Sequence, residues 1–353
     1  MSTTRSVIEL RNVRKDFGDV TAVDDIDLTV EEGEFFSLLG PSGCGKTTTL
    51  RMISGLESPT AGTISLFGTD VTAVPPQERE TNLVFQNLAL FPHMTVEENI
   101  RFGLRHEDVT EDDIRERITE MLRVVDMEGF EDRNVTQLSG GQQQRIALAR
   151  SLAKQPAVLL LDEPLASLDR KLRQRMQFEL KDIQENLGTT FFYVTHDQEV
   201  AMTMSDRMAV MRDGDIVQVG TPEEIYEDPK NSFVADFIGD ANFVDGEITL
   251  DGDGSGGTFE SGDIRVPANG TQAGPAQLVL RPENVDIGRT ASDRKFVFDA
   301  EVTDRIHQGQ TINFSATLDN GVQLEIRQKN HDIRAGDEVA VGFDMADYSI
   351  VTD

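Results

Sequence analysis

The sequence predicts an α/β fold of the phosphate-loop (P-loop) class, with an inserted helical subdomain and a small all-β domain after it. Three observations predict this fold. An apolar run at 35–39 precedes a glycine-rich loop at 40–47 and a helical pattern at 48–53. Residues 89–155 consist mostly of helix-forming segments. Beyond about residue 240, short alternating strands are separated by glycine and aspartate turns, as in small β domains.

The glycine-rich loop reads Gly-Pro-Ser-Gly-Cys-Gly-Lys-Thr and fits the pattern G-x-x-x-x-G-K-[ST]. Its glycines let backbone N–H groups turn toward phosphate oxygens, and the next helix adds its positive dipole end. Lys46 is expected to reach the β- and γ-phosphates, and the Thr47 hydroxyl to ligate Mg²⁺. A chance glycine turn is the alternative, and the flanking strand and helix argue against it. We expect a nucleotide to contact Gly40, Pro41, Ser42, Gly43, Cys44, Gly45, Lys46, Thr47 and Thr48.

An acidic pair follows a second pattern of a buried strand. Residues 157–161 form a continuous apolar run, as parallel strands buried on both faces do. Asp162 and Glu163 come at its end, where open α/β sheets place ligands. Asp162 is suited to hold Mg²⁺, and Glu163 to accept a proton from an attacking water. Alone, a pair before Pro164 would indicate helix-capping acids, but the phosphate loop favours the catalytic interpretation.

A second glycine-bearing element lies between the phosphate loop and the acidic pair. Residues 138–142 read Leu-Ser-Gly-Gly-Gln, and the helix-forming run 143–150 follows them. Ser139 is a natural N-cap, and the free N–H groups beyond it form an anion site. One chain can hardly fold both phosphate-binding elements onto the same nucleotide. The sequence therefore predicts that two subunits share a pair of nucleotides.

With these motifs in this order, the chain resembles the ATP-binding subunits of ABC transporters from about residue 7 to its C-terminus. The resemblance implies that Phe17 stacks on adenine and that Gln86 senses both Mg²⁺ and the membrane partner. It implies that His196 holds the γ-phosphate, and that Asp169, in the segment Ser167-Leu168-Asp169, crosses the dimer. It also implies that the ATP of the other subunit is bound by Ser139, Gly140, Gly141 and Gln142.

The expected catalytic residues are therefore Lys46, Glu163 and His196, and the expected cofactors are ATP and Mg²⁺. We expect the Mg²⁺ ligands to be Thr47, Gln86 and Asp162. The resemblance further implies a homodimer of ATPase subunits, two transmembrane permease subunits, and an extracellular solute-binding protein that acts through the permease.

The expected organisation has two parts. Residues 1–239 form the ATPase domain, with a helical subdomain at about 89–155 and a connector at 221–239, and residues 240–353 form a β-barrel of the oligonucleotide-binding type. This barrel, with its Arg281-Pro282-Glu283 motif, resembles the regulatory domain of importer ATPases. The glycine-rich run 251–257 is expected to be a hairpin turn. Expected helices span 96–104, 111–126, 140–154, 170–186, 222–227 and 232–238. Expected strands include 190–194, 244–250, 277–280, 296–302, 322–326 and 338–343.

Composition sets further limits on the 353-residue chain. Its 33 lysines and arginines face 63 aspartates and glutamates, a formal net charge of −30 at pH 7 that disfavours nucleic acid as a partner. So large an acidic excess is typical of proteins from salt-accumulating organisms.

The single Cys44 excludes an internal disulfide and a cysteine-based metal cluster. No apolar stretch approaches the roughly eighteen residues that a membrane span requires, and the polar N-terminus indicates no signal peptide. We expect a peripheral protein at the cytoplasmic face of the cell membrane.

Other functions are weaker alternatives. A soluble ABC-type ATPase acting on DNA or ribosomes would usually carry two nucleotide domains, a coiled coil or basic patches. A phosphate-loop kinase or GTPase would lack the motif at 138–142. The C-terminal barrel favours import over export. For the solute, the stretches 91–96, 195–207 and 237–243 resemble spermidine/putrescine importers, so polyamine is the preferred prediction and ferric-iron, sugar and inorganic-anion import remain alternatives.

Overall fold

The computed structural model describes residues 5–104, 110–166, 168–250, 256–268, 272–329 and 332–352. The chain divides into two compact units, Met1–Pro222 and Glu223–Asp353. This division differs from the expected boundary at residues 239 and 240, because the connector helices group with the C-terminal unit. Within the described residues, no helix is both long and apolar enough to span a membrane.

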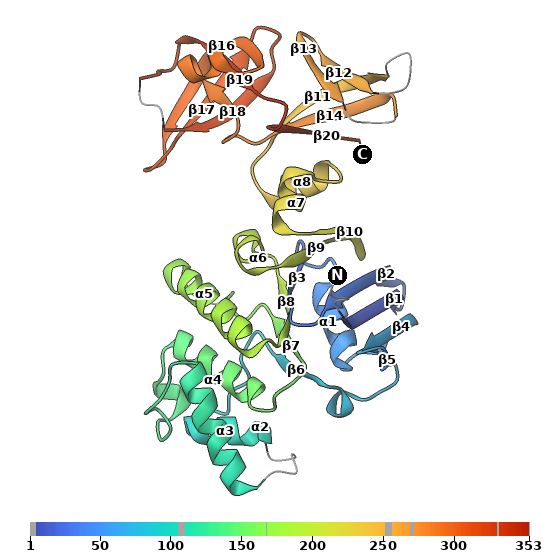
Figure 1. Cartoon of the computed structure of the whole chain (residues 1–353), viewed down its shortest axis with the longest axis vertical. Coiled ribbons are helices and arrows are strands. Elements are labelled where there is room, and N and C mark those ends of the chain that lie inside the picture. Colours follow the sequence, from blue (N-terminus) through green and yellow to red (C-terminus); the bar gives the residue numbers. More distant parts are fainter. Residues whose placement is uncertain are drawn as a thin grey trace. The chain divides into compact units, whose positions relative to one another are not determined.

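The first unit contains two sheets (Figure 1). A six-stranded sheet has the order β10-β9-β3-β8-β7-β6, in which β10 is antiparallel and the others are parallel. Its strands are β3 (Phe35–Leu39), β6 (Thr81–Val84), β7 (Val158–Asp162), β8 (Thr190–Thr195), β9 (Arg207–Arg212) and β10 (Asp215–Gly220). An antiparallel sheet of order β2-β1-β4-β5 is formed by β1 (Ser6–Phe17), β2 (Val20–Glu31), β4 (Ala61–Leu66) and β5 (Thr69–Asp70).

The helices of this unit follow the expected pattern, with small differences at their ends. They are α1 (Lys46–Ser54), α2 (Val96–Leu104), α3 (Glu111–Val124), α4 (Gly140–Leu152), α5 (Arg170–Leu187) and α6 (Gln198–Met204), with short 3-10 helices η1 (Pro76–Glu78) and η2 (Val135–Gln137). α3 and α4 each end two residues before the expected position. Asp126 and Gln155 adopt left-handed backbone angles (φ 53° and 51°), which do not continue a right-handed helix.

Alternate residues of the six-stranded sheet enter two different cores. Phe35, Phe191 and Tyr193 lie in the core that is shared with α2 to α6. Phe36 and Phe192 lie in the core that is shared with α1 and the antiparallel sheet. Because successive side chains of a strand point to opposite faces, the sheet separates α1 from α4. Figure 1 shows these two helices well apart.

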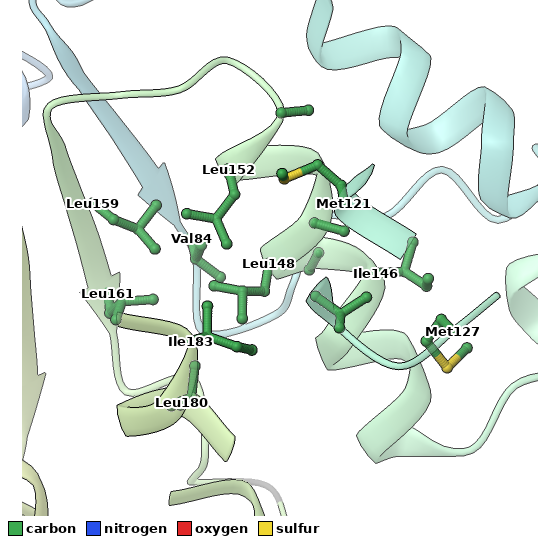
Figure 2. Close-up of a cluster of buried hydrophobic side chains, with 14 of the residues drawn as sticks. Val84, Met121, Met127, Ile146, Leu148, Leu152, Leu159, Leu161, Leu180 and Ile183 are labelled. Atoms are coloured by element: carbon green, nitrogen blue, oxygen red, sulfur yellow. The ribbon is translucent and has the colours of Figure 1, made fainter. Parts of the chain in front are cut away.

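The helix α4 is anchored on the sheet by its second half. Figure 2 shows Leu148 and Leu152 of α4 packed among Val84 of β6 and Leu159 of β7. All four side chains are almost completely buried. Burial of a leucine side chain contributes roughly 1.5–3 kcal/mol relative to an exposed one. These contacts pack the second half of α4 against β6 and β7.

The C-terminal unit holds the connector helices α7 (Pro222–Glu227) and α8 (Ser232–Ile238) and two five-stranded antiparallel sheets. The sheet orders are β13-β12-β11-β14-β20 and β15-β19-β16-β17-β18, and side chains from both sheets share one core. The strands are β11 (Asn242–Leu250), β12 (Gly257–Ser261), β13 (Ile264–Ala268), β14 (Gly274–Leu280), β15 (Asp286–Ile287), β16 (Phe296–His307), β17 (Ile312–Leu318), β18 (Gln323–Gln328), β19 (Glu338–Phe343) and β20 (Tyr348–Val351); η3 spans Gly288–Asp293. The β11–β12 pair flanks the expected hairpin turn, of which residues 251–255 lie outside the described residues.

Arg281 explains why the connector helices group with the C-terminal sheets. Its guanidinium is buried and donates to the carbonyl oxygens of Ala235 (2.8 Å) and Gly239 (3.1 Å) at the end of α8. It also donates to the carbonyl of Tyr226 in α7 (3.1 Å) and lies 4.2 Å from the centroid of that ring. One buried side chain at the end of β14 thus binds both connector helices.

Candidate nucleotide-binding site

The phosphate loop lies between β3 and α1, and close backbone packing requires two of its glycines. A Cβ atom at Gly40 would lie 2.3 Å from the carbonyl oxygen of Met211, and one at Gly45 would lie 2.4 Å from that of Ala22. Gly45 also has a φ of 110°, which side chains disfavour. The loop can therefore adopt this path only with glycine at both positions, and the path brings the N-terminus of α1 to the end of β3.

Lys46 lies folded along the inside of this loop. Its side chain is 5% exposed, and the ammonium donates to the carbonyl oxygens of Gly40 and Pro41, both at 2.8 Å. Both acceptors are neutral, so they do not cancel the charge of the Lys46 ammonium. This charge lies beside the N-terminus of α1, and together they attract anions. Cys44 is also buried, and burial raises the pKa of its thiol, so it remains a small neutral residue of the loop. The remaining predicted loop residues are Ser42 and Gly43, both exposed, and Thr47 and Thr48, both half-buried.

Thr47 and Asp162 come together at the end of β7. The Thr47 hydroxyl donates to Asp162 Oδ1 at 3.2 Å. Burial raises the pKa of Asp162, the hydrogen bond from Thr47 lowers it in part, and the charge of Glu163 raises it further. A partly desolvated carboxylate beside a hydroxyl suits a hard cation such as Mg²⁺.

The metal site would depend on the nucleotide for other ligands. Among the residues that the structure describes, no group of three or more His, Cys, Asp or Glu side chains could hold a metal ion. Mg²⁺ usually binds one or two carboxylates together with waters and substrate phosphates, so this donor set fits it. The predicted third ligand, Gln86, is exposed and lies two residues beyond Val84, which pairs with Leu161. Gln86 therefore follows β6, and Asp162 is the last residue of the neighbouring strand β7, at the same edge of the sheet.

Glu163 and His196 face each other across the ends of β7 and β8. Glu163 Oε1 lies 2.9 Å from His196 Nδ1, and the Glu163 N–H donates to the Val194 carbonyl at 3.0 Å. Glu163 has a φ of 45°, an unfavourable angle for a residue other than glycine, and such backbone is concentrated at functional sites. The imidazole is 53% exposed, whereas the Glu163 side chain is only 19% exposed. The pair therefore presents a ring to solvent while holding the carboxylate in place.

Sequence reasoning did not identify a second ion pair next to His196. Arg173 of α5 donates to Asp197 Oδ2 at 2.7 Å and to the Leu168 carbonyl at 3.1 Å. Asp197 in turn caps α6 by accepting from the Val200 N–H at 3.2 Å. The capping role of an aspartate before a helix is readable in the sequence. No local signal marks the ion pair of Arg173, because its carboxylate partner Asp197 lies 24 residues away in the chain.

The two remaining phosphate-binding candidates lie at the starts of α4 and α5. Ser139 and Gln142 form a reciprocal capping box, with distances of 3.4 Å from the Gln142 N–H to Ser139 Oγ and 3.0 Å from the Ser139 N–H to Gln142 Oε1. Ser139 and Gly140 are exposed, and Gly141 is buried against Leu172. Because the sheet separates α4 from α1, the two phosphate-binding elements stand apart in one chain (Figure 1).

Asp169 caps α5, since its Oδ1 accepts from the Leu172 N–H at 3.1 Å. Its neighbour in the predicted motif, Ser167, lies outside the described residues. Phe17, the predicted adenine platform, ends β1 with 49% of its surface exposed, and Lys15 Nζ lies 4.8 Å from the ring centroid. An aromatic face beside a cation is suited to stacking on a base.

Comparison with known proteins identifies the family. The chain is 46% identical over 347 residues to the spermidine/putrescine import ATP-binding protein PotA of Rubrobacter xylanophilus, covering 96% of this chain and 91% of that protein. It is 52% identical over 284 residues to PotA of Clostridium novyi, covering 80% and 81%. The chain belongs to the ATP-binding proteins of ABC importers. As an ABC ATPase it hydrolyses ATP in connection with transport, which confirms the predicted enzyme class.

Domain families and solved structures agree with this assignment. Residues 23–166 of this chain match the ABC transporter family, and residues 278–351 match the TOBE domain family. CbiO1 of Clostridium perfringens, described as part of the ABC transporter complex cbiONQ, superposes with a TM-score of 0.59 at 28% identity over 63% of this chain and 90% of that one. The cassette MJ0796, in a dimeric structure with ADP and Pi, gives a TM-score of 0.54 at 33% identity over 61% and 98%. The predicted fold, an ABC-type α/β domain followed by an all-β domain, is confirmed.

Proposed function

We propose that this ABC ATPase energises the import of polyamines, of the spermidine and putrescine class. The observation that carries the proposal is similarity along most of the chain to proteins named for spermidine/putrescine import, at 46% to 52% identity. The ATPase would work at the cytoplasmic face of the membrane, with two permease subunits and an extracellular binding protein. The C-terminal unit would act as its regulatory domain.

The proposed roles of the site residues follow from their contacts. The phosphate loop and Lys46 bind the phosphates of ATP, and Phe17 stacks on adenine. Thr47, Asp162 and Gln86 would hold Mg²⁺, which would supply positive charge to the phosphates. Burial raises the pKa of Asp162, and a bound cation would favour its ionised form.

Water activation is assigned to the pair at the ends of β7 and β8. Glu163 is held by its backbone and by His196, so its carboxylate is positioned to accept a proton from the attacking water. With His196 Nδ1 donating to the Glu163 carboxylate, donation from Nε2 to the γ-phosphate requires the imidazolium form, in which both ring nitrogens carry a proton. Positioning and electrostatic stabilisation are the main sources of catalysis in phosphoryl transfer, and this arrangement supplies both.

Two subunits would complete the site. Ser139 to Gln142 of one subunit grip the γ-phosphate of ATP that is held by Lys46 of the other, and Asp169 lies at the crossing point. The separation of α1 from α4 within one chain supports this arrangement, as does the dimeric structure of MJ0796. ATP binding closes the dimer, hydrolysis reopens it, and residues 86–94 carry the motion to the permease.

The test is ATPase activity of the complex reconstituted in proteoliposomes with its cognate binding protein. Spermidine or putrescine should stimulate ATP hydrolysis several-fold, while a sugar or ferric iron should not. Glu163→Gln is the matched inactive control, because it keeps the Mg²⁺ ligand Asp162 and removes the proton acceptor. Stimulation by a sugar or by ferric iron and not by polyamine would overturn the proposed substrate.

A further inference from the structure

The loop at residues 85–91, which contains Gln86 and follows β6, has a strained backbone. Leu88 and Ala89 are consecutive residues with left-handed φ angles of 59° and 45°. Neither is glycine, and both carry a Cβ atom that disfavours this conformation. Such backbone persists only where surrounding groups hold it.

Arg150, in the last turn of α4, holds this loop. Its Nη2 donates to the Leu88 carbonyl and its Nη1 to the Ala89 carbonyl, both at 2.8 Å. The guanidinium also lies 5.6 Å from the ring centroid of Phe91. A planar guanidinium presents its donors in a fixed fork, so it fixes the relative position of two successive carbonyls more firmly than the rotating ammonium of a lysine does. Burial lowers the pKa of Arg150, as expected for a cation held by neutral acceptors.

The ends of the loop are fastened to the same group of helices. Before it, Asn82 Nδ2 donates to the carbonyl of Ser151 in α4 at 2.8 Å. At its last residue, the Phe91 N–H donates to Asn99 Oδ1 of α2 at 2.9 Å. The first turn of α4 carries Ser139 as its cap, and the second half of the helix packs on the sheet (Figure 2). A displacement of α4 must therefore move the loop.

We propose that Arg150 is a positioning residue that transmits phosphate binding at the start of α4 to the loop 85–91 of the same subunit. This inference rests on the proposed shared nucleotide sites. When Ser139 grips the partner's ATP, α4 shifts, and the two bonds from Arg150 carry the Leu88–Ala89 backbone with it. The permease-facing segment thus responds to the nucleotide that the other subunit holds.

The chain contains no tryptophan, so a single introduced indole reports on this loop alone. Phe85 is 40% exposed and directly precedes Gln86, which makes Phe85→Trp a suitable reporter. The full-length protein also carries Glu163→Gln, so that ATP–Mg²⁺ holds it as a dimer. Emission and molar mass by light scattering are measured together for Arg150, Arg150→Lys and Arg150→Gln.

Arg145→Gln is the matched control, because Arg145 lies on the same helix and donates to Val125 (2.9 Å) and Glu179 (2.6 Å), outside the loop. Ser139→Ala tests the trigger, because it keeps the phosphate loop of its own subunit and loses the grip on the partner's ATP. In the parent and in Arg145→Gln, ATP should change the emission and form the dimer. In Ser139→Ala the emission should not change.

Arg150→Gln should still form the dimer but lose most of the emission change, and Arg150→Lys should give an intermediate response. A full emission change in dimeric Arg150→Gln would overturn the inference. If Arg150→Gln does not fold, Arg150→Lys decides, and a response equal to the parent would overturn it. Absence of an ATP-dependent dimer in the parent would instead overturn the shared-site function, and this inference with it.

Discussion

Asp162 and Glu163 are adjacent carboxylates with different surroundings. Burial and the neighbouring Glu163 charge raise the pKa of Asp162, and the hydrogen bond from Thr47 offsets only part of this effect. Glu163 is held beside His196 by a left-handed backbone angle. Without a cation, the ionised Asp162 is destabilising. We interpret the pair as one carboxylate prepared for a metal and one prepared for a proton.

Asp162→Asn should therefore stabilise the nucleotide-free protein at pH 7. Because the folded-state pKa of Asp162 is raised, its ionisation costs stability above that pKa, and an amide removes this cost. The gain in Tm should shrink as pH falls through the folded pKa toward the ordinary carboxyl value of about 4. Affinity for Mg²⁺–ATP should fall at least roughly tenfold. Thermal unfolding across pH and nucleotide titration measure the two effects.

Asp169→Asn serves as the control for this substitution. Asp169 is exposed and caps α5, and asparagine is an equally good N-cap, so the Tm should not change. A lower Tm for Asp162→Asn at pH 7 would contradict the electrostatic account of the metal site.

At the scale of elements, most of the fold could be predicted because local signals agree. The apolar run 35–39 became β3 with the same bounds, and α2, α7, α8 and β19 also match their expected bounds. The positions of helix ends were predicted less accurately where a residue other than glycine or proline ends the helix. Asp126 and Gln155 take left-handed angles there, and nothing in their side chains marks the stop in the sequence.

The contacts between elements could not be predicted in the same way. Arg150 and Arg281 bind backbone carbonyls of segments distant in the chain, and Arg173 binds the distant carboxylate of Asp197. An arginine in a helical or strand pattern usually indicates a solvated surface, and only tertiary structure reveals such partners. For the same reason the connector helices were assigned to the ATPase domain, whereas Arg281 binds them to the C-terminal sheets.

At the scale of the whole molecule, the net charge of −30 dominates the electrostatics. Most of the ion pairs are at least partly exposed, and such pairs contribute little stability each. Repulsion among excess carboxylates disfavours the compact state at low salt.

Molar KCl should therefore raise the Tm, because it shortens the screening length from about 10 Å at 0.1 M to about 3 Å at 1 M. A rise of several degrees between these concentrations is expected, with a similar rise in NaCl. Equal melting temperatures at low and molar salt would contradict the halophile-type interpretation of the charge and leave the enzymology unaffected.

The central claim at this scale is that each ATP is bound by two subunits. Within one chain, the phosphate loop and the start of α4 lie on opposite sides of the six-stranded sheet, so neither can complete the other. Lys46→Ala removes the first element and Ser139→Ala the second. In each altered homodimer, both shared sites therefore lack one of the two residues. In a mixed dimer, one of the two shared sites contains both an intact Lys46 and an intact Ser139.

The most direct measurement is ATP occlusion by mixtures of Lys46→Ala and Ser139→Ala subunits. Both variants carry Glu163→Gln to prevent turnover, and two affinity tags isolate the mixed dimers. Shared sites predict close to one occluded ATP per mixed dimer and almost none in either homodimer. Mixed dimers that form but occlude no more ATP than the homodimers would contradict the account.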